Sequence, residues 1–229
     1  MTEEASGIVF DLDGVLIDTE PIYLETINSI LAGYGVEPLS ASAYSEFIGK
    51  HADFTWSTLG ARHGLPASPD ELKATYDTRL EEILPTRLHL RPDAALLLAA
   101  VGRTAIKTAV ATSSRQRWLD LKISVLGLGP FFGAVVSAEE VGKFKPEPDV
   151  FLVAAERAGI DPARAVAIED SPSGITAAKR AGMRVFALRT ESTMGLDLSE
   201  ADEVIDSLDE IDLGVLFGAR DGGHAPSVV

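Results

Sequence analysis

The chain has 229 residues and contains no cysteine. This absence excludes disulfide bonds, zinc sites built from thiolates, and phosphatase chemistry that uses a cysteine nucleophile. The four histidines are scattered and show no spacing typical of metal ligands. The chemistry of the chain therefore has to come from other residue types.

Long hydrophobic runs are also missing. The longest, residues 94–101, has eight residues, whereas a membrane-spanning helix needs about 20. The first residues, MTEEASG, are acidic and lack the apolar centre of a signal peptide. We therefore expect a cytoplasmic protein without a membrane-spanning segment.

Basic residues are few, with 20 Lys and Arg against 35 Asp and Glu and a net charge of −15. Such a charge repels phosphate backbones and anionic lipids, so neither a nucleic acid nor a membrane is an expected partner. An anionic substrate would have to be met by local positive charge. The length fits one large domain or a core with an insertion, and we take a monomer as the starting hypothesis.

Short apolar segments alternate with helical patterns along most of the chain. Segments that are apolar through most of their length are typical of strands buried on both faces of a sheet. Two of the segments between them have helical patterns with plausible ends, residues 148–159 and 171–182. The expected strands are 7–10, 107–111, 133–137, 165–169 and 184–188. Repeated strand–helix–strand units predict an α/β fold with a parallel sheet.

Residues 19–87 interrupt this alternation because they contain no convincing strand. Thr19 can cap a first helix that reaches Gly33, and further helices are expected near 41–48, 52–63 and 69–84, separated by prolines. We interpret 19–87 as an all-helical insertion after the first strand. Residues 1–18 and 88–229 would form the core.

Polar groups stand at or near the carboxyl ends of the expected strands. Ligands of open parallel sheets bind at this edge. Several carboxylates with no histidine or cysteine nearby suit a hard cation, and Mg²⁺ is the first choice because it also leaves positions for phosphate oxygens. The residues are Asp11 and Asp13, Thr112, Ser113 and Ser114, Lys145, Glu169 and Asp170.

Each segment also has a simpler interpretation. The stretch DLDG could be a plain turn, but it fails as a calcium-binding loop, because position six from Asp11 is Leu16 and position twelve is Ile22. The stretches ATSS, KPEPD and EDSPSG could each be structural, as strand-end caps, a rigid loop and a helix N-terminus. The set is informative because all four occur in order at strand ends.

These segments resemble the haloacid dehalogenase superfamily. The first motif, D-x-D-G-x-L-x-D, is matched from Asp11 to Asp18; the others are matched at Thr112, in K-P-x-P-D from Lys145, and in E-D-S-x-x-G from Glu169. The resemblance spans residues 7 to about 217 and is closest to the sugar-phosphate phosphatase, phosphoglycolate phosphatase and beta-phosphoglucomutase branch. It implies a Rossmann-like core with an inserted helical cap that sets substrate specificity.

The resemblance also implies roles for the residues. Asp11 would attack phosphorus to form an aspartyl-phosphate, and Asp13 would act as general acid and base. Mg²⁺ would be held by Asp11, the Asp13 carbonyl and Asp170, with Glu169 nearby. Thr112, Lys145 and backbone groups near Ser113 would bind the phosphate, which belongs to a small phosphorylated metabolite such as a sugar phosphate.

Three functions stay open at this point. A phosphatase is favoured, because Asp13 argues against halide release and no Arg closely follows Gly49, where beta-phosphoglucomutases have one; the sequence continues KHADF. A phosphomutase is the alternative, and a catalytically silent regulator that binds Mg²⁺ and phosphate is the third. Candidate substrate contacts from the insertion and the second motif are Thr19, Gly49, Arg79, Ser114 and Arg115.

Overall fold

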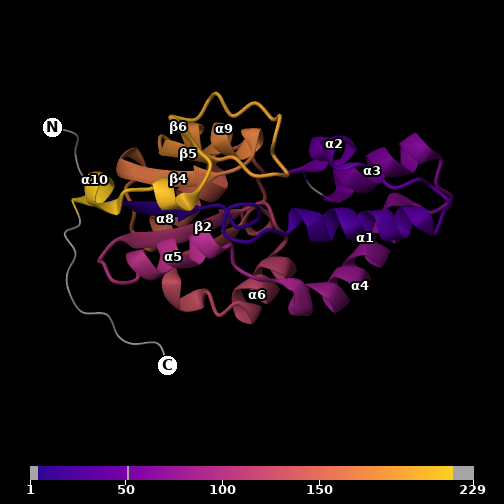
Figure 1. Cartoon of the computed structure of the whole chain (residues 1–229), viewed down its shortest axis with the longest axis horizontal. Helices are drawn as coiled ribbons and strands as arrows, with labels where there is room; N and C mark the ends of the chain where they lie inside the picture. Colours follow the sequence, from indigo (N-terminus) through magenta and orange to yellow (C-terminus); the bar gives the residue numbers. More distant parts are fainter. Residues whose placement is uncertain (1–4, 51, 219–229) are drawn as a thin grey trace.

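The computed structural model describes residues 5–50 and 52–218, and its centre is a six-stranded parallel sheet (Figure 1). The sheet order is β3-β2-β1-β4-β5-β6. The chain runs from β1 outward to β3 and then returns to β4 on the other side of β1. The strands are β1 (Gly7–Phe10), β2 (Lys107–Thr112), β3 (Ala134–Ser137), β4 (Ala165–Glu169), β5 (Arg184–Leu188) and β6 (Glu203–Ile205). The predicted α/β fold with a parallel sheet is thus confirmed.

The central strands are buried on both faces, as their continuous apolar sequences predict. All four residues of β1 and all five of β4 are buried. Phe10 at the end of β1 lies opposite Val110 of β2 and Ile168 of β4. This register brings the residues that follow the three strands to one edge of the sheet.

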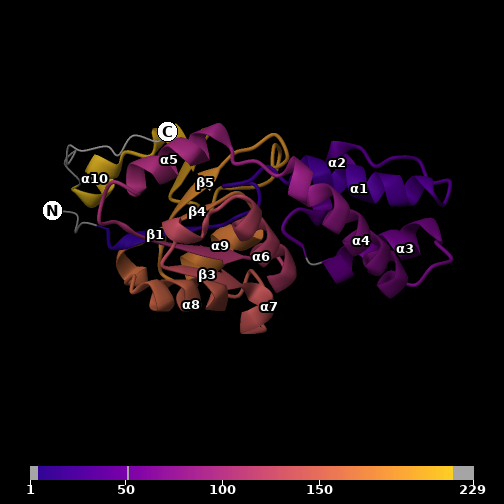
Figure 2. The ribbon, with the colours of Figure 1, turned by 90° about the horizontal axis from the view of Figure 1, so that it is seen from below.

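Helices cover both faces of the sheet (Figure 2). One face packs against α5 (Pro92–Val101), α6 (Gln116–Val125) and α10 (Leu213–Phe217). The other packs against α8 (Asp149–Ala158) and α9 (Pro172–Arg180), with the short α7 (Ala138–Val141) after β3. Single 3₁₀ turns are η1 (Ser45–Phe47), η2 (Gly129–Phe131), η3 (Pro162–Arg164) and η4 (Leu208–Glu210).

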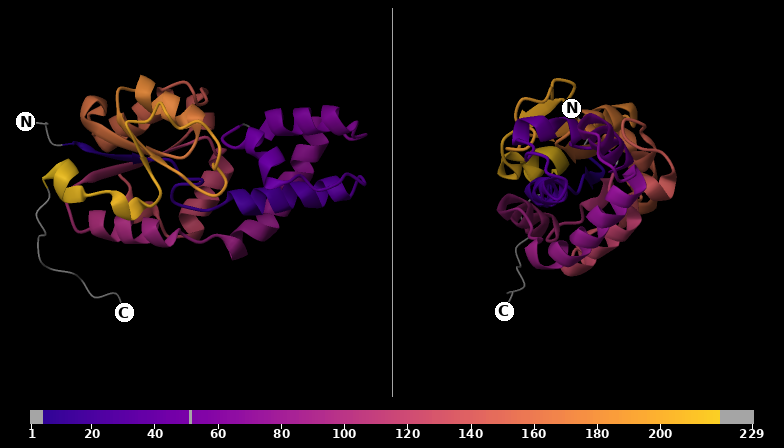
Figure 3. Two further views of the ribbon diagram at one scale, coloured as in Figure 1. Left: turned by 45° about the horizontal axis from the view of Figure 1, so that its top comes forward. Right: turned by 90° about the vertical axis from the view of Figure 1, so that its right-hand side faces the viewer.

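Four helices between β1 and β2 form a separate group beyond one end of the sheet (Figure 3). They are α1 (Glu20–Ala32), α2 (Ala41–Tyr44), α3 (Ala52–His63) and α4 (Pro69–Arg87), and we call them the helical cap. The cap has its own hydrophobic cluster around Trp56 and Leu59, which are fully buried. Trp118 of α6 joins this cluster and so ties the cap to the sheet and its covering helices, which together we call the sheet domain as a label only. These helices fall within the predicted insertion, 19–87, whose status as a domain stays a prediction.

Helix boundaries follow local chemistry with a few departures from expectation. Ser68 and Glu71 form a capping box at the start of α4. The helix was expected to end at residue 84, before Pro85, but it continues to Arg87. A proline here removes only one intrahelical bond near the end, and the Leu88 amide still donates to the Leu84 carbonyl at 3.0 Å.

Thr19 stands at the start of α1, yet its side chain makes no capping hydrogen bond to the helix. None of the described helices combines the length and the apolar character needed to cross a membrane. Residues 219–229 of the predicted core lie outside the described residues.

Candidate active site

A pocket opens between the carboxyl ends of the strands and the helical cap, with about 940 Å³ of empty space when the open solvent at its mouth is included. The sheet domain contributes ten of the lining residues, which are Asp11, Asp13, Thr112, Ser113, Ser114, Arg115, Trp118, Lys145, Asp170 and Ser171. Most of the residues predicted from the strand ends therefore share one cavity.

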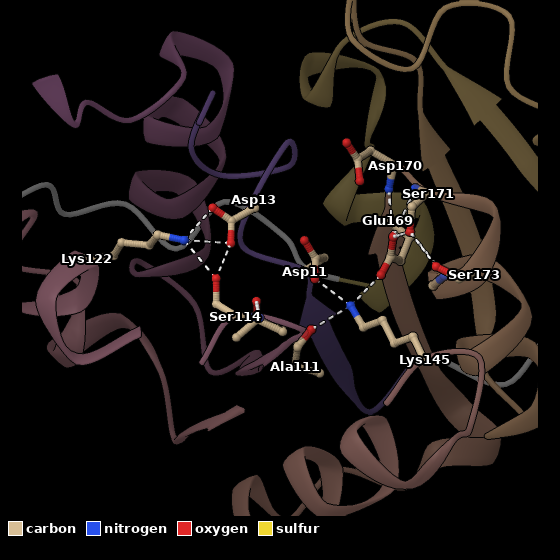
Figure 4. A network of polar contacts seen from close by, with 12 residues as sticks. Asp11, Asp13, Ala111, Ser114, Lys122, Lys145, Glu169, Asp170, Ser171 and Ser173 are labelled. Carbon is tan, nitrogen blue, oxygen red and sulfur yellow. Dashed lines mark hydrogen bonds and ion pairs between the residues drawn. The ribbon is translucent and has the colours of Figure 1, made fainter. Parts of the chain in front are cut away.

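Lys145 holds Asp11 at the floor of the pocket (Figure 4). Its ammonium group donates to Asp11 Oδ1, to Glu169 Oε1 at 2.5 Å and to the Ala111 carbonyl at 3.0 Å. Burial raises the pKa of Asp11 to about 7, against the opposing charge of Lys145, and the neighbouring Glu169 adds to the rise. Burial alone would lower the pKa of Lys145, but the two carboxylates outweigh it and raise that pKa.

Asp170 lacks a partner for one of its oxygens. Within residues 5–50 and 52–218, its Oδ2 is buried and accepts no hydrogen bond. Burial, Glu169 and Asp11 together raise the pKa of Asp170 well above its usual range. Gly14 makes room for this carboxylate, since a Cβ there would lie 1.9 Å from Oδ2. If all three were ionised, Asp11, Glu169 and Asp170 would carry more negative charge than Lys145 balances.

Glu169 lies behind the pocket wall and both of its oxygens already accept hydrogen bonds. Oε1 accepts from Lys145, and Oε2 accepts from the amides of Asp170 and Ser171 and from the Ser171 hydroxyl at 3.0–3.1 Å. Among the described residues, no three acidic or histidine side chains are arranged as a ready metal site. The predicted metal-binding role of Glu169 thus stays a prediction, and its observed contacts orient Lys145 and the start of α9.

Asp13 is held by four side chains on the opposite side of Asp11 (Figure 4). Lys122 of α6 donates to both of its oxygens, at 2.5 and 2.7 Å. Thr19 donates to Oδ1 at 2.6 Å, Tyr23 donates to the same oxygen at 3.2 Å, and Ser114 donates to Oδ2 at 2.6 Å. Burial would raise the pKa of Asp13, but the charge and hydrogen bonds of Lys122 outweigh it and lower that pKa.

These contacts involve two residues that were predicted to contact substrate, and those substrate contacts stay predictions. Thr19 is fully buried, does not line the pocket and donates its hydroxyl to Asp13. Ser114 lines the pocket, but its hydroxyl also donates to Asp13. Lys122 was missed by the sequence analysis, although it shares the buried side of α6 with Trp118 and Leu119. A lysine within an apolar helical stripe was the signal that could have identified it.

The cap side of the pocket is mostly aromatic and apolar. It contains one acid, Glu20, whose carboxylate accepts a hydrogen bond from the Tyr44 hydroxyl at 2.6 Å. Burial raises the pKa of Glu20 to about 7, although the Tyr44 hydrogen bond opposes the shift. Glu20 was also missed, because an acid in the first turn of a helix is common for structural reasons.

Of the other cap residues predicted to contact substrate, Gly49 lines the pocket and Arg79 does not. Gly49 has φ +70° and lies so close to α9 that a Cβ would be 3.2 Å from Ser171 Cβ. Arg79 donates instead to the Ser29 hydroxyl at 2.6 Å, within the cap, and its contact with substrate stays a prediction.

Arg115, another predicted substrate contact, lines the pocket, but its guanidinium is already bound. It makes a two-pronged ion pair with Asp77 of α4, with Nη1 2.9 Å from Oδ2 and Nη2 bonded to Oδ1. Both side chains are largely buried, with 13% and 12% of their surface exposed. The pair links the sheet domain to the cap.

Comparison with known proteins places these features in a family. Residues 8–188 match the family model described as "Haloacid dehalogenase-like hydrolase". The chain is 31% identical to a phosphorylated carbohydrates phosphatase of Thermotoga maritima over 86% of this chain and 92% of that protein. It is also 31% identical to hexitol phosphatase A of Escherichia coli over 90% and 92% of the two chains.

A solved structure shares the fold. The crystal structure of CbbY from Rhodobacter sphaeroides, in complex with xylulose-(1,5)bisphosphate, has a TM-score of 0.80 to this chain. The two are 26% identical, and the match covers 93% of this chain and 99% of that one. The likeness therefore includes both the sheet domain and the helical cap.

Proposed function

We propose a substrate and a mechanism for this chain, which belongs to the haloacid dehalogenase-like hydrolases and is a phosphatase of that family. It cleaves the phosphate ester of a small sugar or polyol phosphate. The reaction passes through an aspartyl-phosphate and uses Mg²⁺ as cofactor. The observation that carries the proposal is the floor of the pocket. There Lys145 donates a hydrogen bond to the buried Asp11, and the neighbouring Asp170 Oδ2 has no partner among the described residues.

The residues at the floor fit a Mg²⁺ ion. Carboxylate and carbonyl oxygens are the ligands that this ion prefers. The raised pKa values of Asp11 and Asp170 reflect buried carboxylates that lack sufficient positive charge. Asp11, Asp170 and the Asp13 backbone carbonyl would hold the ion, with Glu169 behind them. When bound, Mg²⁺ would supply the positive charge that lets a carboxylate approach a phosphate dianion.

Asp11 is the proposed nucleophile. Lys145 fixes its Oδ1, so the carboxylate has a defined orientation at the pocket floor. A carboxylate oxygen of Asp11 forms a bond to phosphorus while the bond to the leaving oxygen breaks. Lys145, the Thr112 hydroxyl and backbone N–H groups near Ser113 line the space for the other phosphoryl oxygens, where they stabilise the charge that spreads in the transition state.

Asp13 is the proposed general acid and base. Lys122, Ser114 and Thr19 donate hydrogen bonds to the Asp13 carboxylate and keep it apart from the carboxylate of Asp11. A nearby phosphate dianion raises the pKa of a carboxyl group, so substrate favours the protonated form that can donate to the leaving oxygen. The resulting carboxylate, stabilised by Lys122, then takes a proton from the water that hydrolyses the aspartyl-phosphate.

The leaving group fits an uncharged chain with hydroxyl groups. The cap side of the pocket offers Tyr23, Tyr44, Tyr76, Thr55 and Glu20 as hydrogen-bonding groups among apolar residues. A phosphomutase would need a second, uncommitted cationic site opposite Asp11. Arg115 is paired with Asp77, and Arg79 lies outside the pocket, so these two residues do not favour that alternative.

A screen of phosphorylated metabolites at millimolar Mg²⁺, read by phosphate release, tests the proposal. We expect release from sugar or polyol monophosphates and from p-nitrophenyl phosphate, and loss of release in Asp11→Asn with the fold retained. Conversion of beta-glucose 1-phosphate to glucose 6-phosphate would instead support a mutase. Absence of phosphate release from every ester would contradict a phosphatase and leave the regulator hypothesis.

A further inference from the structure

The buried ion pair between Arg115 and Asp77 joins a residue of the pocket wall to the helical cap. Arg115 precedes α6, and Asp77 lies in the middle of α4, so the pair forms only because the two helices pack together. Two parallel N–H···O contacts make this the strong, oriented form of an Arg–carboxylate pair. Arg117 adds a longer contact, with its Nη1 3.8 Å from Asp77 Oδ2.

The pair matters because of the other charges around the pocket. Among the described residues, the cationic side chains that line it are Lys50, Arg115 and Lys145. Lys145 is committed to Asp11 and Glu169 at the floor, and Lys50 lies at the exposed rim. Arg115 is thus the buried cation placed to meet a second anionic group of a substrate, and Asp77 already neutralises it.

We propose that Asp77 is a specificity-determining residue: by holding Arg115, it fits the site to phosphate monoesters whose leaving group carries no second anionic group. The inference rests on the proposed phosphatase function and adds the charge of the leaving group to it. A second phosphate would have to displace Asp77 from Arg115, and the largely buried carboxylate would keep only its longer contact with Arg117.

Replacement of Asp77 would reverse this preference. Asp77→Asn keeps the size of the side chain but removes the charge, so Arg115 is left in the pocket wall without a counter-ion. A second phosphate on a substrate then supplies the missing negative charge through charge-assisted hydrogen bonds. Hydrogen bonds to charged groups are strong enough for a gain of about ten- to a hundred-fold in relative affinity.

The test compares fructose 1,6-bisphosphate with fructose 1-phosphate as inhibitors of p-nitrophenyl phosphate turnover, at fixed free Mg²⁺. The measured quantity is the ratio of their two inhibition constants, which does not depend on whether either sugar phosphate is also cleaved. We expect Asp77→Asn to shift this ratio toward the bisphosphate by about tenfold or more. A shift below about threefold in a folded variant would overturn the inference.

Two further variants isolate the cause. Glu81→Gln breaks the ion pair between Glu81 and Arg117, which joins the same two helices, but leaves Arg115 bound to Asp77. Its ratio should stay at the wild-type value, and a bisphosphate gain there would assign the effect to a loosened cap and overturn the inference. The double variant Asp77→Asn/Arg115→Gln should lose the gain, because the receptor for the second phosphate is removed.

A variant that keeps Asp77 guards against misfolding of Asp77→Asn. If Asp77 occupies Arg115, then Arg115→Gln alone should leave the inhibition ratio near its wild-type value. A selective loss of bisphosphate affinity of tenfold or more would show that Arg115 binds the second phosphate already, and would refute the inference. A wild-type protein that does not turn over p-nitrophenyl phosphate at all would instead contradict the proposed phosphatase function.

Discussion

Replacement of Lys122 by Met should destabilise the fold because it leaves Asp13 without its counter-charge. Lys122 is fully buried, and its ammonium group lies 2.5 and 2.7 Å from the two Asp13 oxygens. Methionine retains most of the length and apolar surface of lysine. The variant therefore tests the charge of Lys122 rather than its packing.

The size of the effect follows from the burial of the pair. Removal of one partner from a buried ion pair destabilises a protein by about 3–5 kcal/mol. Asp13 keeps hydrogen bonds from Thr19 and Ser114, and 16% of its side-chain surface is exposed. These contacts place the expected loss at the lower end, about 3 kcal/mol at pH 7.

Urea unfolding at pH 7 in the presence of EDTA measures this loss, since EDTA removes any bound metal. Lys179→Met is the matched control, because Lys179 pairs with Asp202 at the surface, where both side chains are 37% exposed. That change should reduce stability by less than about 1 kcal/mol. The double variant Asp13→Asn/Lys122→Met should be more stable than the sum of the two single effects predicts, by about 1–2 kcal/mol. A Lys122→Met loss no larger than the control, or strict additivity, would refute the reasoning.

Three further perturbations follow from the site. EDTA should abolish phosphate release and added Mg²⁺ should restore it; activity that persists in EDTA would remove the metal from the account. Because the pKa of Glu20 is raised from 4.5 to about 7, the native state binds a proton that the unfolded chain has released. The free energy of unfolding of the metal-free protein should thus fall as the pH rises from 4.5 to 7. The fall should be about 3 kcal/mol larger in the wild-type protein than in Glu20→Gln. Parallel curves of unfolding free energy against pH for the two proteins would contradict this. Gly14→Ala should weaken Mg²⁺ binding by about tenfold or more, because the added Cβ would displace Asp170. A tenfold change corresponds to about 1.4 kcal/mol of binding free energy. Gly35→Ala is the control in a Mg²⁺ titration of activity, since Gly35 has a similar φ of +73° and a Cβ there would have no atom within 4 Å. Equal effects of the two changes would argue against the role of Gly14 in making room for Asp170.

The sheet could be predicted from the sequence because its central strands are apolar throughout. β6, with the sequence EVI, was missed because two of its three residues are exposed and the strand is very short. The helix α5 was missed although its sequence is strongly apolar, because a short apolar run does not distinguish a buried helix from a strand.

The residues of the pocket floor could be predicted because each directly follows a buried strand or lies in a distinctive motif. Contacts between elements could not, because they depend on how the cap packs on the sheet domain. Lys122 reaches Asp13 across 109 positions of the chain, and Arg115 reaches Asp77 across 38. A single sequence contains no signal that either pair of residues is in contact. Arg115 was therefore predicted to contact substrate, although it is already paired with Asp77.

Trapping of the aspartyl-phosphate is the most direct test of the central claim. Asp13→Asn should slow hydrolysis of the intermediate, while p-nitrophenyl phosphate needs no proton on its leaving oxygen. Mixing this variant with p-nitrophenyl phosphate that carries a radioactive phosphate, followed by an acid quench, should label the protein. In a second, unlabelled sample, borohydride reduction should release the phosphate and convert Asp11 to homoserine, which mass spectrometry can locate. A burst of p-nitrophenolate with label and modification at Asp11 is the predicted result, whereas turnover without either, or modification at another residue, would contradict it.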